Sequence, residues 1–159
     1  MNSKKTYSFD EAQILLENYC AYQERCHKEV TDKLKNMRMI PEAIDNIIVH
    51  LIQHNYLNEQ RFAKAFTRGK FRIKKWGKNR IIRELKFRQI SDYAIKSGLK
   101  EIKLDVYHKT LQELTEKRIA QVKEKDRYKK RKKVADYLLY RGWESNLVYE
   151  KINELINYL

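Results

Sequence analysis

Three similar segments recur along this chain at nearly constant spacing, and this repetition restricts the fold more than any other feature. Each segment contains an apolar pair four residues apart: Val30 and Leu34, Ile81 and Leu85, and Val134 and Leu138. Leu85 follows Leu34 by 51 positions, and Leu138 follows Leu85 by 53. A period of about fifty residues is typical of small helical units stacked in a row. We therefore expect three tandem repeats.

Each repeat is expected to contain three helices, with the apolar pair on the second. A short polar or basic break then leads to a bulky apolar residue, which is Ile40, Ile90 or Trp143. The third helix is expected to start at Pro41, Ser91 or Ser145, which suit the N1 or N-cap position. The sequence thus predicts an all-α fold of three three-helix repeats in an elongated, curved array, with boundaries at 1–56, 57–100 and 101–159.

Local signals support this helical interpretation. Ser8 with Glu11 forms a capping-box pattern at the first helix. The apolar spacing from Ile44 to Leu51 fits one face of a helix, and Asn58 is a suitable cap for the next one. The last repeat is expected to begin with a long charged helix over about residues 102–125.

Composition agrees with a helical protein whose charge is concentrated in one region. Four glycines and one proline are too few for a turn-rich β protein. The net charge is +14, and residues 59–100 alone hold 14 Lys and Arg against three Asp and Glu. Such a concentration raises the local potential and favours an anionic partner.

The centre of this basic region is the stretch "RGKFRIKKWGKNRIIREL", residues 68–85. Its alternation at residues 70–74 is compatible with a strand, but a longer window favours a helix that ends at Gly77, with the next starting at Lys78 or Asn79. At 3.6 residues per turn, one face is apolar and includes Phe62, Phe66, Gly69, Ile73 and Trp76. A second face carries Lys64, Arg68, Arg72 and Lys75. Phe71 falls beside this basic row, as an exposed aromatic or a partner contact.

A row of cations without acidic neighbours gains nothing from ion pairs, and its members repel one another. This favours contact with an anionic surface over a merely solvated face.

A second basic run, residues 123–133, is typical of nucleic-acid contact or of a flexible link. The candidate binding residues are Lys64, Arg68, Lys70, Arg72, Lys75, Lys78, Arg80, Arg83, Lys129, Lys130, Arg131 and Lys132.

Motifs for catalysis or for metal binding are weak. His50 and His54 have a helical i, i+4 spacing, but "HLIQH" lacks the Glu of a zinc-protease motif and no third ligand is evident. Cys20 and Cys26 suit a reducing cytoplasm better than a disulfide framework. The sequence has no apolar run of membrane-spanning length. We therefore expect a cytoplasmic protein. We also expect it to be a monomer, to have no enzymatic activity and to bind no metal or cofactor.

Residues 56–90 resemble the middle repeat of the RecX regulatory proteins, bacterial modulators of the RecA recombinase. The matching residues are Tyr56-Leu57, Arg61-Phe62-Ala63, Phe66, Arg68, Lys70, Gly77, Arg80-Ile81 and Glu84-Leu85. The flanking repeats match more loosely, through their apolar positions and the "LLYRGW" segment.

The resemblance implies a row of repeats that lies in the groove of the RecA filament on single-stranded DNA. Such proteins inhibit filament growth, ATP hydrolysis, strand exchange and co-protease activity, and so modulate recombination and DNA repair. Capping of filament ends, coating of the groove and removal of RecA from DNA all remain open. The alternative is a stand-alone protein that binds single- or double-stranded DNA directly, although no short helix carries the residues typical of base reading.

Overall fold

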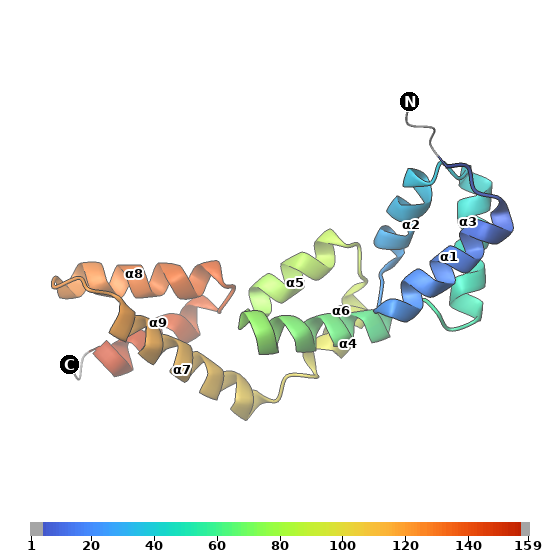
Figure 1. Ribbon diagram of the computed structural model, residues 1–159. Helices are drawn as coiled ribbons and strands as arrows, with labels where there is room; N and C mark the ends of the chain where they lie inside the picture. The colour runs from blue at the N-terminus through green and yellow to red at the C-terminus, as the bar shows by residue number, and fades with distance from the viewer. Residues whose placement is uncertain (1–4, 157–159) are drawn as a thin grey trace. The chain divides into compact units, whose positions relative to one another are not determined.

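The computed structural model describes residues 5–156, and every regular element in that range is helical (Figure 1). The nine α-helices of this range are α1 Phe9–Tyr22, α2 His27–Asn36, α3 Pro41–Gln53, α4 Glu59–Gly69, α5 Lys78–Phe87, α6 Asp92–Leu99, α7 Leu104–Gln121, α8 Arg127–Tyr140 and α9 Ser145–Ile156. A π-helical turn, η1 Lys70–Lys74, continues α4. The predicted all-α fold of helical repeats is confirmed.

The chain divides into two compact units, each with its own internal packing. Among the described residues, the first unit contains 5–65 and 86–98, and the second contains 66–85 and 99–156. The division falls within α4 and α5, so each unit holds parts of the chain that are far apart in sequence.

The core of the first unit lies among α1, α2 and α3. The repeated pair of α2, Val30 and Leu34, is fully buried there. Ile47 and Leu51 of the predicted α3 stripe are also buried, and they pack in the same cluster. Apolar residues four apart lie on one face of a helix, so the spacing seen in the sequence is the spacing of the core.

The predicted helix starts are present. Glu11 N–H donates to Ser8 Oγ at 3.1 Å and Ser8 N–H donates to Glu11 Oε1 at 3.2 Å, which completes the capping box. These hydrogen bonds stabilise the carboxylate and hold the pKa of Glu11 below its usual value. Asn58 Oδ1 accepts the N–H of Arg61 at 2.9 Å as the cap of α4.

Three helices end in the same way, and this geometry corrects one expectation. Arg38, Asn55 and Gly142 have positive φ, and the next residue donates back to the last helical turn, as in a Schellman motif. Met39 N–H, for example, donates to Leu34 O, as Trp143 N–H does to Leu138 O. The equivalent of Trp143 is therefore Met39. Ile40, assigned that place from the sequence, is the exposed N-cap of α3.

Arg61 connects three segments within the first unit. Its Nε donates to Glu24 Oε1 at 2.5 Å, and its guanidinium also donates to Asn55 Oδ1 and to the Asn55 carbonyl, both at 3.0 Å. The carbonyls after α3 would otherwise lack helical partners. Arg61 therefore fixes the start of α4 against the α3 end, which gives this family-motif residue a structural role.

The second unit is built on α7, α8 and α9, which pack on one another. The predicted long helix is α7, although it is shorter at both ends than expected. Trp143 and Tyr107 are almost fully buried and their rings stack with centroids 4.4 Å apart. Trp143 Nε1 donates to the carbonyl of Lys75 at 3.1 Å, so the segment after η1 is attached to this core.

The faces predicted for the basic stretch were wrong beyond Phe66. Ala63, Thr67 and Phe71 are buried, whereas Ile73, assigned to the apolar face, is 78% exposed. Phe71, assigned beside the basic row, packs against Tyr107 and Trp143 with ring centroids 5.9 and 6.4 Å away. Ala63 and Thr67 lie in α4, and Phe71 lies in the π-helical turn η1, where the 3.6-residue period no longer applies.

The end of this helix also differs from the prediction. The helical part stops at Lys74, and Lys75 in the left-handed conformation terminates it. Gly77 lies beyond the helix and is buried against the backbone of Gly142. The following helix, α5, starts at Lys78 as expected.

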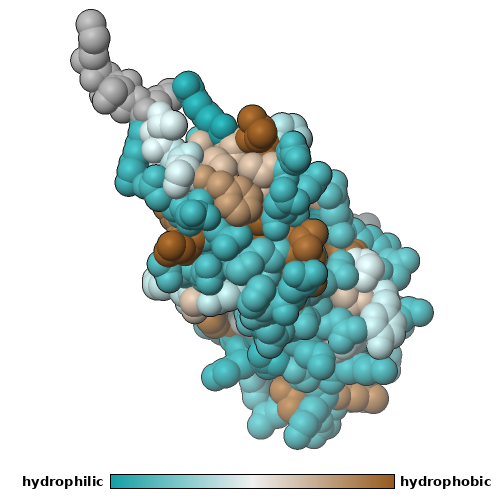
Figure 2. All heavy atoms as spheres, turned by 90° about the vertical axis from the view of Figure 1, so that its right-hand side faces the viewer, coloured by the Kyte–Doolittle hydropathy of each residue, from teal (hydrophilic) through white to brown (hydrophobic). Residues whose placement is uncertain are grey.

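One face of the molecule is largely polar (Figure 2). Figure 2 shows that hydrophilic side chains predominate on this face and that hydrophobic ones form small separate groups. Among residues 5–156, the structure contains no helix with the length and apolar character needed to cross a membrane.

Candidate basic interface

Five residues of the second unit form an alternation of rings and cations, which we term the Trp76 ladder: Phe66, Lys70, Trp76, Arg80 and Tyr140. Lys70 Nζ lies 5.1 Å from the centre of the Trp76 ring, and Arg80 Cζ lies 4.3 Å from it. Lys70 also lies over Phe66, and Arg80 over Tyr140. Each such contact is worth about 0.5–1 kcal/mol at an exposed site. The fold thus holds two predicted cations in place without neutralising them.

Arg72, Lys75 and Arg83 are the most available of the predicted cations. All three are exposed, and none forms an ion pair within the described part of the chain. Arg72 comes from η1, Lys75 from its left-handed terminus and Arg83 from α5. Cations that lack internal partners retain their full charge for an external anion.

Three other predicted cations have partners or a different location. Arg68 Nη1 lies 2.5 Å from Glu101 Oε1, with half of its side chain exposed. Lys78 Nζ lies 4.7 Å from the centre of the Tyr107 ring. Lys64 is half-buried on α4 in the first unit, whereas the other predicted cations belong to the second.

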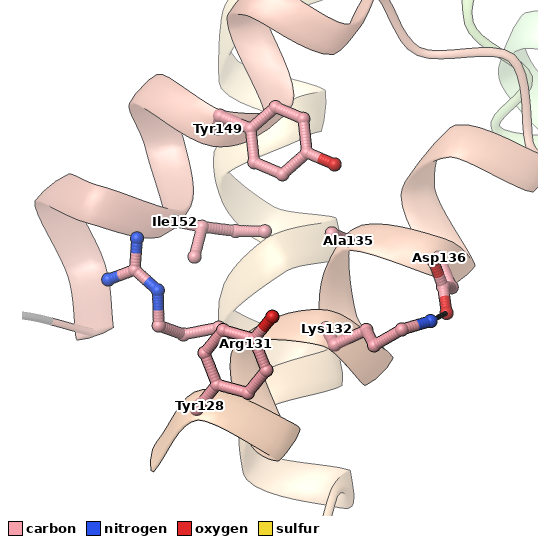
Figure 3. A pocket seen from close by; sticks show the side chains of 7 residues that line it. All are labelled: Tyr128, Arg131, Lys132, Ala135, Asp136, Tyr149 and Ile152. Carbon is pink, nitrogen blue, oxygen red and sulfur yellow. Dashed lines mark hydrogen bonds and ion pairs between the residues drawn. The ribbon is translucent and has the colours of Figure 1, made fainter.

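The second basic run extends from the segment before α8 into the first half of that helix. Lys129 and Lys130 follow the N-cap Asp126, whose side chain accepts the N–H of Lys129 at 2.9 Å. Arg131 donates to Asn153 Oδ1 of α9, and Lys132 pairs with Asp136 at 3.1 Å. Arg131 and Lys132 also line a groove of about 390 Å³ beside α9 (Figure 3).

Sequence reasoning missed the aromatic partners of these cations. Tyr140 was not singled out, and Trp76 was assigned to the core although it is only half-buried. Tyr137 was missed as well: Arg118 Cζ and Arg141 Cζ lie 4.5 and 4.7 Å from its ring centre. The signal available was the tyrosine spacing in "YLLYRGW", which places Tyr137 and Tyr140 one turn apart on a helix.

The histidine pair shows no metal-site geometry. His50 Nε2 lies 3.6 Å from Glu17 Oε1, and His54 Nδ1 lies 3.0 Å from the carbonyl of His50. Within residues 5–156 no group of three or more His, Cys, Asp or Glu side chains is placed to hold a metal ion. His50 is half-buried, and His54 is the C-cap residue of α3.

These features define a class: a helical-repeat protein with a cationic face in which aromatic rings support the charges. Family models specify the class further. The model described as RecX, second three-helix domain, matches residues 58–99, and the model described as RecX, third three-helix domain, matches residues 105–152. The chain belongs to the RecX family.

Relatives and solved structures agree with this assignment. The regulatory protein RecX of Finegoldia magna is 30% identical over 139 residues, which are 85% of this chain and 67% of that protein. For the RecX of Clostridioides difficile the values are 25% identity, 89% of this chain and 66% of that protein. The RecX of Oceanobacillus iheyensis is 26% identical, and the match covers 91% of this chain and 53% of that protein. The chain thus spans about half to two thirds of the length of these relatives.

Two crystal structures have the same fold. RecX from Lactobacillus salivarius superposes with a TM-score of 0.80 at 23% identity, over 95% of this chain and 97% of that one. A second structure, described as regulatory protein RecX, gives a TM-score of 0.82 at 21% identity, over 92% of this chain and 73% of that one. At these identities the likeness establishes the fold alone.

Proposed function

We propose that this protein binds the RecA filament on single-stranded DNA and inhibits its extension, ATP hydrolysis, strand exchange and co-protease activity. It would thereby modulate recombination and DNA repair in the cytoplasm, as a monomer. Membership of the RecX family supports the choice of RecA. The observation that carries the proposal is the set of exposed, unpaired cations Arg72, Lys75 and Arg83 beside the Trp76 ladder.

The physical basis is electrostatic complementarity. DNA phosphates and acidic protein surfaces both present dense negative charge, and a cationic face accelerates association with either. Cations held over aromatic rings lose less side-chain entropy on binding than free ones, because the ordering cost is already met within the fold.

The test is DNA-dependent ATP hydrolysis by the RecA of the same bacterium, titrated with this protein at about 50 and 200 mM salt. Inhibition at amounts well below one molecule per RecA would support filament regulation and a block on growth. Absence of inhibition at both salt concentrations would contradict the proposal.

A second candidate function, direct DNA binding without RecA, has one specific observation in its favour. The alternation of rings and cations in the Trp76 ladder is also the pattern of surfaces on which bases stack and phosphates are neutralised. Under this alternative the protein would bind bare DNA tightly, with an affinity that falls steeply as salt rises. Under the first proposal tight binding requires the filament, so the same titration on DNA alone separates the two.

A further inference from the structure

The groove between α8 and α9 combines three kinds of side chain. At its base lie the buried residues Ala135 and Ile152, which are 3% and 1% exposed. Two tyrosines flank it: Tyr128 from α8 is 79% exposed and Tyr149 from α9 is 49% exposed. In Figure 3 Ile152 lies between the two rings, with Arg131 extending to one side and Lys132 to the other.

Exposed tyrosines at a groove have few structural reasons to be there. A tyrosine that serves the core is buried, as Tyr107 is at 1% exposure. Tyr128 contributes little to folding at 79% exposure, yet its ring lines the groove together with that of Tyr149. At about 390 Å³, the groove falls within the range of about 300–1,000 Å³ that is usual for small-ligand sites.

The charges of α8 indicate an anionic occupant. One acidic residue, the N-cap Asp126, stands at this helix start, and the four cations Arg127, Lys129, Lys130 and Arg131 follow it within five residues, so cations remain in excess. Cations at a helix N-terminus oppose the helix dipole and destabilise the helix by about 0.3–1 kcal/mol each. A bound anion would remove this penalty. The first turns of α5 and α9, like that of α8, hold no acidic residue, so what sets α8 apart is the number of its cations.

We propose that the α8–α9 groove binds one nucleotide of a single-stranded nucleic acid. The base stacks on Tyr128 and Tyr149 above Ile152, and the phosphates lie against the cations of the first two turns of α8. The exposed pair of Lys132 and Asp136 is worth little by itself, and Lys132 can turn to a phosphate at small cost. A duplex is excluded from this role because its bases remain stacked on one another.

A single-stranded occupant fits better than an acidic peptide. A peptide would require only the cations and the residues beneath the groove, whereas two exposed rings on opposite sides of Ile152 suit a planar base. Base–aromatic stacking also tolerates any sequence, since every base has a π face. This inference concerns other residues than the Trp76 ladder and is tested without RecA, so it can fail while inhibition of RecA is retained.

The test measures fluorescence anisotropy of a labelled oligothymidine of about 12 nucleotides, with an abasic oligonucleotide of the same length as the second probe. The two probes carry the same phosphates, so their difference in affinity reports the bases. We expect the wild type to prefer oligothymidine by at least about fivefold, the lower end of what stacking one base provides. Tyr128→Ala and Tyr149→Ala should each lose most of this preference and bind the abasic probe as before.

Matched variants keep this test falsifiable. Tyr93→Ala removes an equally exposed ring from α6 and should change neither affinity, and Tyr149→Phe should retain the preference. A wild type without preference for the bases would overturn the proposal. So would tyrosine variants that bind oligothymidine normally but lose binding to an acidic aromatic peptide, because the groove would then be a protein-docking surface.

Discussion

Gly77 and Gly142 meet backbone to backbone in the second unit: a Cβ on Gly77 would lie 2.5 Å from the carbonyl carbon of Gly142. At this contact Gly77 N–H donates to the Arg141 carbonyl and Asn79 N–H donates to the Gly142 carbonyl, both at 2.9 Å. The segment that follows η1 is thus attached to the end of α8 by main-chain hydrogen bonds. Neither glycine can be replaced without moving backbone.

We therefore expect Gly77→Ala to lower the free energy of unfolding by at least about 2 kcal/mol, because its clash involves backbone atoms that cannot rotate away. Urea denaturation would measure this as a lower midpoint. The matched control is Gly69→Ala. Gly69 is helical, and an added Cβ has no atom within 4 Å. Gly69→Ala should raise the free energy of unfolding by up to about 1 kcal/mol. Equal stability of both variants would contradict the assigned contact.

Tyr107 should make the stability of the second unit dependent on alkaline pH. Its hydroxyl accepts the N–H of Lys78 at 2.9 Å and donates to Glu144. Burial, followed by the hydrogen bond to the Glu144 carboxylate, raises the pKa of Tyr107 well above its usual value. The folded state therefore keeps the proton while the unfolded state releases it near pH 10. The resulting stabilisation is complete below about pH 10 and declines as the pH rises further.

The comparison of wild type with Tyr107→Phe isolates this effect from the other tyrosines and lysines. Phe removes both hydrogen bonds, so the variant should be less stable by about 1–3 kcal/mol at neutral pH. The difference should shrink above about pH 10, by at most about 1.4 kcal/mol per pH unit. A stability difference that stays constant up to about pH 11 would show that the hydroxyl does not remain protonated in the fold.

The two cysteines should be unreactive until the first unit opens. Cys20 and Cys26 are 6% and 0% exposed. Burial raises the pKa of Cys20 to about 11 and also raises that of Cys26, whose thiol donates to Glu29 at 3.3 Å. Because the thiolate is the reactive form, a thiol reagent at about pH 8 should modify the native protein slowly and the urea-unfolded protein rapidly. Equally fast modification of both states would show that the core of α1–α3 opens readily.

Some parts of this fold could be predicted because the signals are local. Each apolar pair, such as Ile81 and Leu85, is fully buried, since residues four apart on a helix share a face whatever surrounds them. Caps such as Ser8 and Asn58 were equally clear, because a side chain and a main-chain N–H three residues away determine them.

Other parts could not be predicted, because contacts distant in sequence decide them. The π turn η1 places Phe71 in the core and Ile73 in solvent, the reverse of a 3.6-residue period. Nothing in the stretch itself indicates that Phe71 packs on Tyr107 and Trp143. The stretch also does not indicate that Gly77 makes a close contact with Gly142. The basic residues were visible in the sequence, but their division into ring-supported, paired and free cations is a property of the tertiary structure.

That division leads to the prediction that tests the interface. Replacement of Arg72, Lys75 and Arg83 by Glu should raise by at least tenfold the concentration needed to inhibit the RecA ATPase, because three free cations become repulsive. The control replaces three exposed lysines of another segment, Lys103, Lys109 and Lys117, by Glu, so the net charge changes equally. Both variants should keep the helical content of the wild type by circular dichroism, since none of the six residues forms an ion pair in the described structure. If the two variants lose inhibition equally, net charge governs the inhibition and this face has no special role. If only the first variant loses it, the residues of η1 and α5 carry the contact.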